Sequence, residues 1–209
     1  MANDVRTDSL NRVIAGGSNP TPSGSVPALA RLADLPQTPF KGSPFNVGAT
    51  IQAEDFDLGG ENVAYHDNDA LNKGGAYRRA EGVDIQATAD TGGGYNVGRT
   101  NPGEWMEYTI NIPTTGHYSI ATRLASPKAG NFHYEIDGID VTGNIAFPAT
   151  GAYKNWTTIT NNLGSLAAGA HILRLVNGTG AVNFNWLKIT RPKHHHRRHH
   201  APSRSSATA

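Results

Sequence analysis

Closely spaced turn signals divide this chain, from residue 49 to residue 190, into short segments of strand character. Gly-Gly, Asp-Gly and Asp-Asn steps and single Gly or Pro residues separate runs that are rich in β-branched and aromatic side chains. No stretch shows helical periodicity of useful length, and strands do not alternate with helices. Many short strands with turns between them predict an all-β fold, a sandwich of two antiparallel sheets.

Seven of these segments show the clearest strand pattern. They cover residues 83–85, 105–112, 117–124, 131–136, 156–159, 171–176 and 182–189, and a further short strand is expected at 51–54. Asp137-Gly138 lies between two apolar runs and predicts a tight hairpin, because this dipeptide accepts the backbone angles of such a turn.

Alternation along three segments predicts which side chains face the core. In 105–112 the inward set is Met106, Tyr108, Ile110 and Ile112. In 171–176 it is His171, Leu173 and Leu175, because the other set has Arg174 at its centre. In 182–189 the apolar set is Val182, Phe184 and Trp186, which leaves Asn183, Asn185 and Leu187 on the opposite face. Core or sheet-packing roles are also expected for Trp105, Trp156, Phe184 and Trp186.

The two ends of the chain differ in composition from this central region. Residues 1–48 are rich in Pro, Gly and Ser and predict a disordered linker, because they cannot bury enough apolar surface to offset chain entropy. Residues 192–209 form a His- and Arg-rich segment with almost no apolar side chains, which predicts a solvated, disordered tail. One domain is therefore expected at residues 49–191.

Charge and composition exclude several classes of partner. The formal net charge is +1 over 209 residues, which gives no electrostatic argument for a nucleic acid. No apolar run has the length of a membrane span. The chain has no cysteine, so disulfides and thiolate metal sites are excluded. The N-terminus has no apolar segment of the secretory type, which fits an intracellular protein or a piece of a longer secreted one.

The segment Ile51-Gln52-Ala53-Glu54 opens the structured region and alternates apolar and polar side chains. In a strand, Gln52 and Glu54 would point to one face, and their oxygen atoms are of the kind that binds calcium. The alternative is an edge strand whose polar face is simply solvated. These four residues alone do not decide between the two interpretations.

Residues 51–190 as a whole resemble a carbohydrate-binding module of family 6. The resemblance rests on IQAEDFD, GGGYNVGRTNPGEWMEYTINIPTTGHYSIATRLAS, DGIDVTGNIAFPATGAYKNWTT and LAAGAHILRLVNGTGAVNFNWLKI, in this order and with matching spacing. The segment containing NKGGAYRRAEGVDI resembles the members appended to agarases and related enzymes. The resemblance implies a jelly-roll sandwich, a sugar site in the loops at one end and, in many members, a second site on the concave sheet face.

The resemblance also implies one structural calcium ion. Its ligands would be Gln52, Glu54, a main-chain carbonyl near Thr91, and Asn185 in the last strand. Family members often have Asp at this last position. Asn185 therefore removes one negative charge, which should lower calcium affinity while keeping an oxygen ligand.

The family's sugar site uses two aromatic rings that enclose one sugar and an Asn that bonds its hydroxyl groups. One ring corresponds to Tyr153 and the amide to Asn183, but the second ring is replaced by Arg99. A guanidinium does not offer the apolar face of a ring, so Arg99 either weakens the site or adapts it to an anionic sugar. Tyr77 and Tyr95, in Gly-flanked loops, are the candidates to replace the missing ring.

These features predict a non-catalytic, monomeric module that binds a polysaccharide or oligosaccharide and directs a catalytic domain of a longer, extracellular parent chain to it. The ligand classes implied are agarose, xylan, a β-glucan or an anionic glycan. Glu81 and Glu104 are the acidic residues a small hydrolase would use, but neither has a recognisable catalytic context. The alternative is a structural or protein-binding sandwich with a degenerate sugar site.

Overall fold

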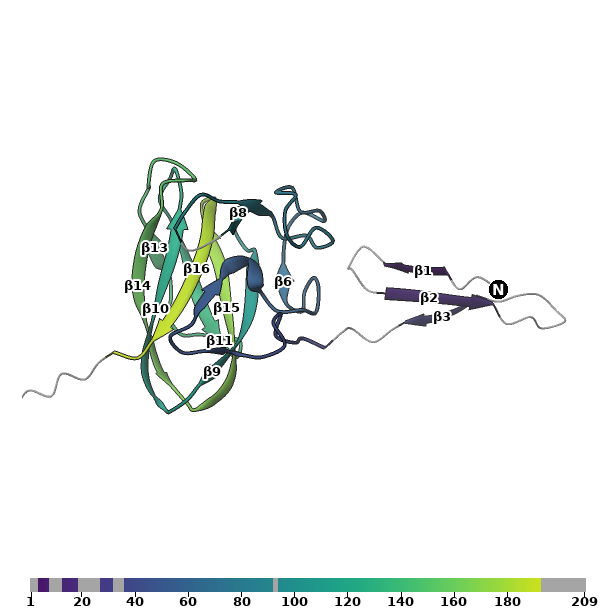
Figure 1. The fold of residues 1–209 in the computed structure, drawn as a ribbon, viewed down its shortest axis with the longest axis horizontal. Coiled ribbons are helices and arrows are strands. Elements are labelled where there is room, and N and C mark those ends of the chain that lie inside the picture. The colour runs from purple at the N-terminus through teal and green to yellow at the C-terminus, as the bar shows by residue number, and fades with distance from the viewer. Residues whose placement is uncertain (1–3, 8–12, 19–26, 32–35, 92–93, 193–209) are drawn as a thin grey trace, which may run out of the picture.

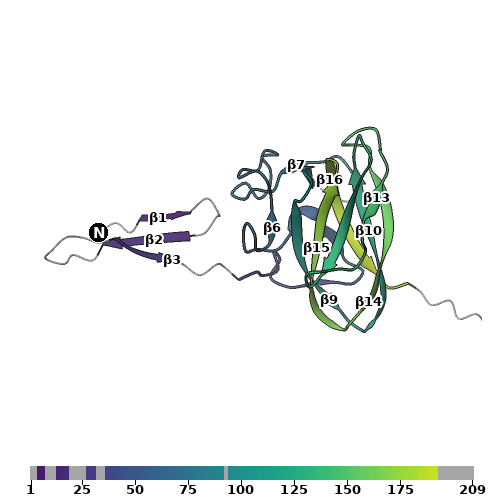
Figure 2. The ribbon, with the colours of Figure 1, turned by 180° about the vertical axis from the view of Figure 1, so that it is seen from behind.

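The computed structural model of the chain describes residues 4–7, 13–18, 27–31, 36–91 and 94–192. Figures 1 and 2 show the main body from opposite sides as two β-sheets packed face to face. This confirms the predicted all-β sandwich. Nearly all of the predicted C-terminal tail, residues 193–209, lies outside the described residues.

The first layer of the sandwich is a six-stranded sheet in the order β14-β10-β16-β8-β7, with β5 paired to β16 beside this path. Its members are β5 (Thr50–Gln52), β7 (Ile85–Ala87), β8 (Tyr95–Thr100), β10 (Gly116–Ala125), β14 (Thr157–Leu166) and β16 (Val182–Thr190). The loop after β7 and the segment before β14 lie close together, since residues of both line one groove.

The second layer is a seven-stranded sheet in the order β12-β11-β15-β9-β4, with β13 paired to β11 and β6 to β9. Its members are β4 (Phe45–Asn46), β6 (Tyr65–His66), β9 (Trp105–Ile112), β11 (Gly130–Ile136), β12 (Ile139–Asp140), β13 (Ile145–Phe147) and β15 (Gly169–Thr179). β4 runs parallel to β9, whereas β15 pairs with β9 and β11 in antiparallel fashion.

Most predicted strands are confirmed, with small shifts at their ends. The predicted strand 105–112 coincides with β9, and 117–124, 131–136, 171–176 and 182–189 lie within β10, β11, β15 and β16. Asp137 and Gly138 form the predicted turn between β11 and β12, both with positive φ. The strand predicted at 83–85 was misplaced, since β7 begins at Ile85.

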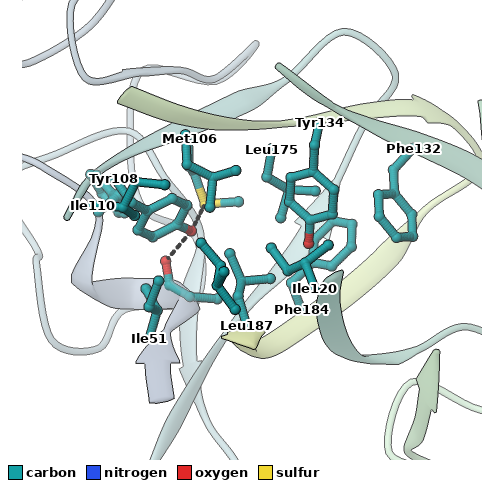
Figure 3. Packing of buried hydrophobic residues seen from close by; sticks show 14 of the residues in the cluster. Ile51, Met106, Tyr108, Ile110, Ile120, Phe132, Tyr134, Leu175, Phe184 and Leu187 are labelled. Atoms are coloured by element: carbon teal, nitrogen blue, oxygen red, sulfur yellow. Dashed lines mark hydrogen bonds between the residues drawn. The ribbon is translucent and has the colours of Figure 1, made fainter. Parts of the chain in front are cut away.

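The core between the sheets contains the apolar side chains that alternation predicted for β9 and β15. The inward position predicted with them for His171 is wrong: this residue is only half-buried, and its ring pairs with Asp137 at 2.7 Å. Met106, Tyr108, Ile110, Leu173 and Leu175 are buried in one continuous cluster (Figure 3). The Tyr108 hydroxyl is fully buried and donates to the Ala53 carbonyl at 2.9 Å, so the one polar group of this ring is satisfied.

The predicted strand at 51–54 is only partly confirmed. β5 ends at Gln52, and Ala53–Asp55 form a short 3-10 helix, η1. The strand stops because its pairing with β16 ends where Gln52 lies opposite Trp186, after which the chain turns toward Tyr108. Gln52 and Glu54 are therefore not related by strand alternation, as the sequence suggested, and Glu54 is a helical residue.

The faces predicted for β16 are wrong beyond Phe184. Along β10, Arg123 lies opposite Trp186 and Leu124 lies opposite Phe184, so Asn185 is an extra residue in a β-bulge. One inserted residue exchanges the two faces of everything that follows it. Leu187 is accordingly buried in the core, whereas Trp186 is half-buried on the outer face.

The region predicted as a linker contains ordered elements. β1 (Asp4–Thr7), β2 (Val13–Ser18) and β3 (Pro27–Arg31) pair as a separate three-stranded sheet, and residues 1–3, 8–12, 19–26 and 32–35 lie outside the described residues. Residues 37–47 belong to the sandwich, since Thr38 bridges to Leu58 and β4 pairs with β9. The sandwich thus begins before the boundary predicted at residue 49.

Candidate functional site

A groove of about 530 Å³ opens on the outer face of the six-stranded sheet, between the loop after β7 and the segment before β14. It is lined by Gln86, Ala87, Thr88, Ala89, Asp90, Thr91, Asn96, Arg123, Tyr153, Lys154 and Trp156. We refer to the cleft that these residues line as the groove. Their mixture of two aromatic rings, amides and charged groups suits a ligand with both apolar faces and hydroxyl groups.

Tyr153 and Asn183, the two predicted sugar-binding residues with the family's usual chemistry, are in contact, but only Tyr153 lines the groove. Asn183 is buried and donates from Nδ2 to the Tyr153 carbonyl at 2.9 Å, which fixes the loop that carries the ring. The Tyr153 side chain is 45% exposed, so its face is open to a ligand.

Gly98 leaves the space that Asn183 and Gln86 occupy. A Cβ at this position would approach Asn183 Oδ1 to 3.0 Å and the Gln86 side chain to 3.2 Å. Glycine therefore allows two amide groups to meet under the β7–β8 hairpin, beside the groove. This close approach explains the glycine that precedes Arg99.

Arg99, which replaces the second ring, does not line the groove. Its backbone has φ of 54°, a left-handed conformation, and its side chain is exposed. Burial raises the pKa of Asp84, and the positive charge of Arg99 partly opposes that shift. The Arg99 guanidinium thus interacts electrostatically with Asp84 and not with the groove.

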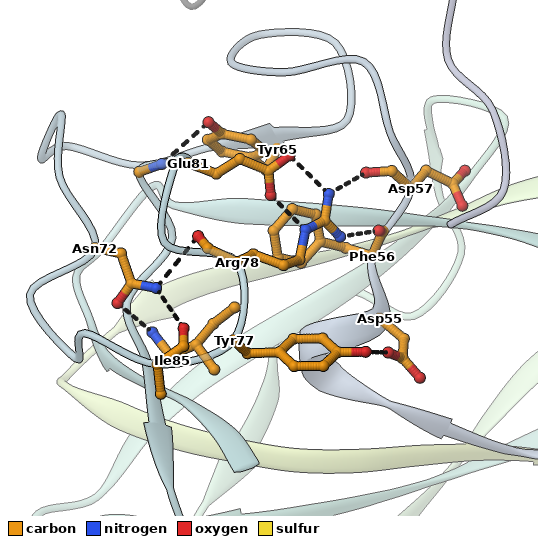
Figure 4. A network of polar contacts seen from close by, with 11 residues as sticks. Asp55, Phe56, Asp57, Tyr65, Asn72, Tyr77, Arg78, Glu81 and Ile85 are labelled. Atoms are coloured by element: carbon orange, nitrogen blue, oxygen red, sulfur yellow. Dashed lines mark hydrogen bonds and ion pairs between the residues drawn. The ribbon is translucent and has the colours of Figure 1, made fainter. Parts of the chain in front are cut away.

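The structure separates Tyr77 and Tyr95 from Tyr153. Tyr95 pairs with Ala87 and faces the same side as the buried Ile85, away from Gln86. The Tyr77 and Tyr95 rings pack 5.1 Å apart, and the Tyr77 hydroxyl donates to Asp55 at 2.8 Å (Figure 4). These two rings fasten the loop before β7 to η1, and neither lines the groove.

Two of the residues predicted to bind calcium, Glu54 and Asn185, carry buried oxygen atoms. Glu54 is 4% exposed and Asn185 is fully buried, and neither Glu54 Oε2 nor Asn185 Oδ1 accepts a hydrogen bond from a described residue. Burial raises the pKa of the Glu54 carboxyl to about 7. Buried oxygens of this kind are costly unless a cation or a donor compensates them, so these residues fit an oxygen-liking ion.

The other two predicted ligands lie on neighbouring segments of the chain fold. Gln52 lies opposite Trp186 in the β5–β16 ladder, one residue from Asn185, and η1 packs against β16. Thr91 lines the groove next to Asp90. The described part of the chain contains no group of three His, Cys, Asp or Glu residues that could hold a metal, so an ion here would need amide and carbonyl oxygens besides the Glu54 carboxylate.

Three site residues escaped sequence analysis. Asp90 and Arg123 form a two-pronged ion pair in the groove, with Nε to Oδ2 at 2.9 Å and Nη2 to Oδ1 at 2.7 Å. Trp156, expected to pack in the core or sheet, is a half-buried groove residue. Only the pairing of strands across the sheet brings these positions together, and no local sequence pattern signals it.

Trp105 has the sheet-packing role that the sequence predicts. It is half-buried on the outer face of the seven-stranded sheet, where the Arg174 guanidinium lies 4.2 Å above its ring centre. Arg174 is held by Glu107 at 2.6 Å and Glu135 at 3.1 Å. The ring is therefore covered by a paired cation on this face.

A β-sandwich with a groove on one sheet face is typical of ligand-binding modules, and comparisons with known proteins identify the family of this module. The family described as "Carbohydrate binding module (family 6)" matches residues 74–191, more than half of the chain. The chain belongs to this family, and it is a carbohydrate-binding module.

Solved structures of family members support the assignment. A module from Cellvibrio mixtus lichenase 5A, in complex with cellotriose, is 35% identical with a TM-score of 0.55 and covers 70% of this chain and 99% of its own. The C-terminal module of a marine laminarinase from Zobellia galactanivorans is 31% identical with a TM-score of 0.54, covering 68% and 98%.

Two longer proteins contain similar regions. The clotting factor G alpha subunit of Tachypleus tridentatus is 36% identical over 120 residues, which is 56% of this chain and 18% of that protein. The β-agarase AgaA of Microbulbifer thermotolerans is 26% identical over 96 residues, 44% of this chain and 22% of that protein. The chain thus spans less than a quarter of either relative. No helix among the described residues could cross a membrane.

Proposed function

We propose that this module binds a β-linked glucan in the groove and holds an attached catalytic domain of a longer extracellular protein on that polysaccharide. The observation that carries the proposal is the exposed Tyr153 ring, fixed by Asn183 and facing a groove with amide, charged and aromatic walls. A pyranose offers an apolar face to such a ring and hydroxyl groups to the amides. The cellotriose complex and the laminarinase module among its relatives support a glucan as the first ligand to test.

Agarose, xylan and anionic glycans remain the comparison ligands. Arg99, which suggested an anionic sugar, lies outside the groove, and Arg123 within it is already paired with Asp90. Lys154 is the remaining cation on the groove wall. This balance favours a neutral sugar over a sulfated or uronic one.

Native affinity electrophoresis in gels containing laminarin, lichenan, agarose, xylan or pectin tests the proposal. We expect retardation in a glucan gel, and Tyr153→Ala should weaken the affinity about tenfold or more, because it removes the stacking surface. Tyr118→Phe serves as the control, since that ring is buried at the other end of β10. Unchanged mobility of the wild-type chain in every gel would favour the alternative, a sandwich that binds protein through a degenerate sugar site.

The same proposal includes a structural calcium ion held by Glu54, Asn185, Gln52 and a carbonyl near Thr91. The orphaned oxygens of Glu54 and Asn185 support it. Such an ion would neutralise the buried carboxylate and tie η1 to β16. Binding to the native state alone would raise the stability of the module by mass action.

A further inference from the structure

The side-chain amide of Asn185 has two different environments at its two ends. Nδ2 donates to Asp90 Oδ2 at 2.6 Å, whereas Oδ1 is buried and accepts nothing from a described residue. Because the amide is planar, fixing its nitrogen toward Asp90 fixes its oxygen on the opposite side. The reversed orientation would bring Oδ1 against the Asp90 carboxylate, which is electrostatically unfavourable.

Asp90 is itself held in place. Its side chain is 5% exposed, and both of its oxygens accept from the fork of Arg123. Asp90 therefore presents a fixed acceptor to Asn185.

Asp90 and Arg123 also line the groove, together with Thr91. One carboxylate thus contacts the buried amide on β16 and, through its ion pair, forms part of the ligand-binding wall. Asn185 lies in the β-bulge, where no ladder partner on β10 restrains it. Its orientation depends on the Asp90 contact.

We propose that Asp90 is the positioning residue that couples a divalent-cation site at Glu54 and Asn185 to the groove. Asp90 orients the Asn185 amide so that Oδ1 can bind the cation. A cation bound to Oδ1 in turn stabilises the ion pair of Asp90 with Arg123 on the groove wall. By linkage, cation and sugar then raise each other's affinity by the same factor. The sugar half of this coupling rests on the proposed function, but the cation half does not.

The first experiment uses calcium alone. Calcium should raise the melting temperature of the wild-type chain relative to chelator, and it should shift the NMR signals of the Arg123 Nε–H and the Trp156 indole. Asp90→Ala should weaken calcium affinity about tenfold or more and abolish those groove shifts, as loss of an outer-shell partner does at metal sites. Glu135→Ala is the matched control, because it removes one carboxylate from Arg174 on the other sheet and should leave calcium binding unchanged.

A paired exchange separates positioning from general destabilisation. Asn185→Asp alone places two carboxylates in contact and should lower the melting temperature in chelator. Asp90→Asn with Asn185→Asp restores one donor and one acceptor in reversed order, and should recover calcium affinity to at least the wild-type level. Calcium affinity equal to wild type in Asp90→Ala, or no recovery in the folded double variant, would overturn the proposal.

The second experiment measures affinity for a laminarin oligosaccharide with calcium and with chelator. We expect at least a fivefold calcium effect in the wild type and none in Asp90→Ala. If sugar binds equally well in both conditions, the coupling is wrong although the proposed function stands. If no glycan binds at all, the proposed function fails, and the calcium-induced shifts at Arg123 and Trp156 decide the inference.

Discussion

At the scale of single residues, Asn185 shows what the sequence reveals and what it hides. An amide in a closing strand is unusual, because Asn is depleted in strands, and the resemblance to family 6 made this one a candidate ligand. The structure makes it the extra residue of a bulge, with a buried oxygen. Sequence alternation cannot anticipate a bulge, because the inserted residue looks like any other strand position.

The bulge leads to a test at Leu187. Alternation places this side chain outside, whereas the structure places it fully in the core. Leu187→Ala should therefore lower the free energy of unfolding by about 3 kcal/mol, through lost burial and a new cavity. Lys188→Ala, one position along on the half-exposed face, should change it by less than about 0.5 kcal/mol. Equal effects of the two substitutions in urea unfolding would contradict the assigned faces.

At the scale of elements, the strands were easier to predict than the loops that carry the sites. β9 and β10 were predicted because their residues alternate over a full strand and turn signals bound them. The short strands β4 and β6 and the groove loop after β7 have no periodic pattern, and the alternation of residues 51–54 runs on into the 3-10 helix that carries Glu54. Their conformations depend on tertiary contacts such as Asp90 with Arg123, which join residues far apart in the chain.

Arg78 is the main tertiary contact of the loop before β7. Its guanidinium lies 3.6 Å from the centre of the Phe56 ring and 4.5 Å from that of Phe40, and it bonds the carbonyls of Phe56 and Asp57 and the carboxylate of Glu81 (Figure 4). The side chain is thus buried but fully paired. It joins three segments around η1, the element that carries Glu54.

We expect Arg78→Ala to lower the free energy of unfolding by about 3 kcal/mol, because it leaves Glu81 and two carbonyls without their donor. The adjacent Arg79 is exposed, and Arg79→Ala removes the same charge with an expected effect below about 0.5 kcal/mol. Urea unfolding monitored by tryptophan fluorescence compares the two. A similar loss in both variants would show that charge, not the buried contacts, governs this loop.

At the scale of the whole molecule, composition located the domain but not its beginning. The Pro- and Gly-rich texture of residues 1–48 predicts a linker, yet its last part is bound to the sandwich by individual side chains. Gln37 donates to Asp57 at 2.9 Å, Lys41 pairs with Asp55 at 2.6 Å, and Phe45 packs against the core. Sparse anchors of this kind leave no periodic signal in the sequence.

Two truncated chains test where the domain begins. Removal of residues 1–35 should leave the melting temperature of the sandwich unchanged, because the described strands β1–β3 pair with one another and with no strand of the sandwich. Removal of residues 1–48 should cost about 3 kcal/mol, since it exposes the surfaces under Phe40 and Phe45 and leaves the buried Asp55 without Lys41. Calorimetry of both chains gives the difference directly. Equal stability of the two would place the boundary at residue 49 after all, and would mean that the segment from Gln37 to Val47 lies on the sandwich without stabilising it.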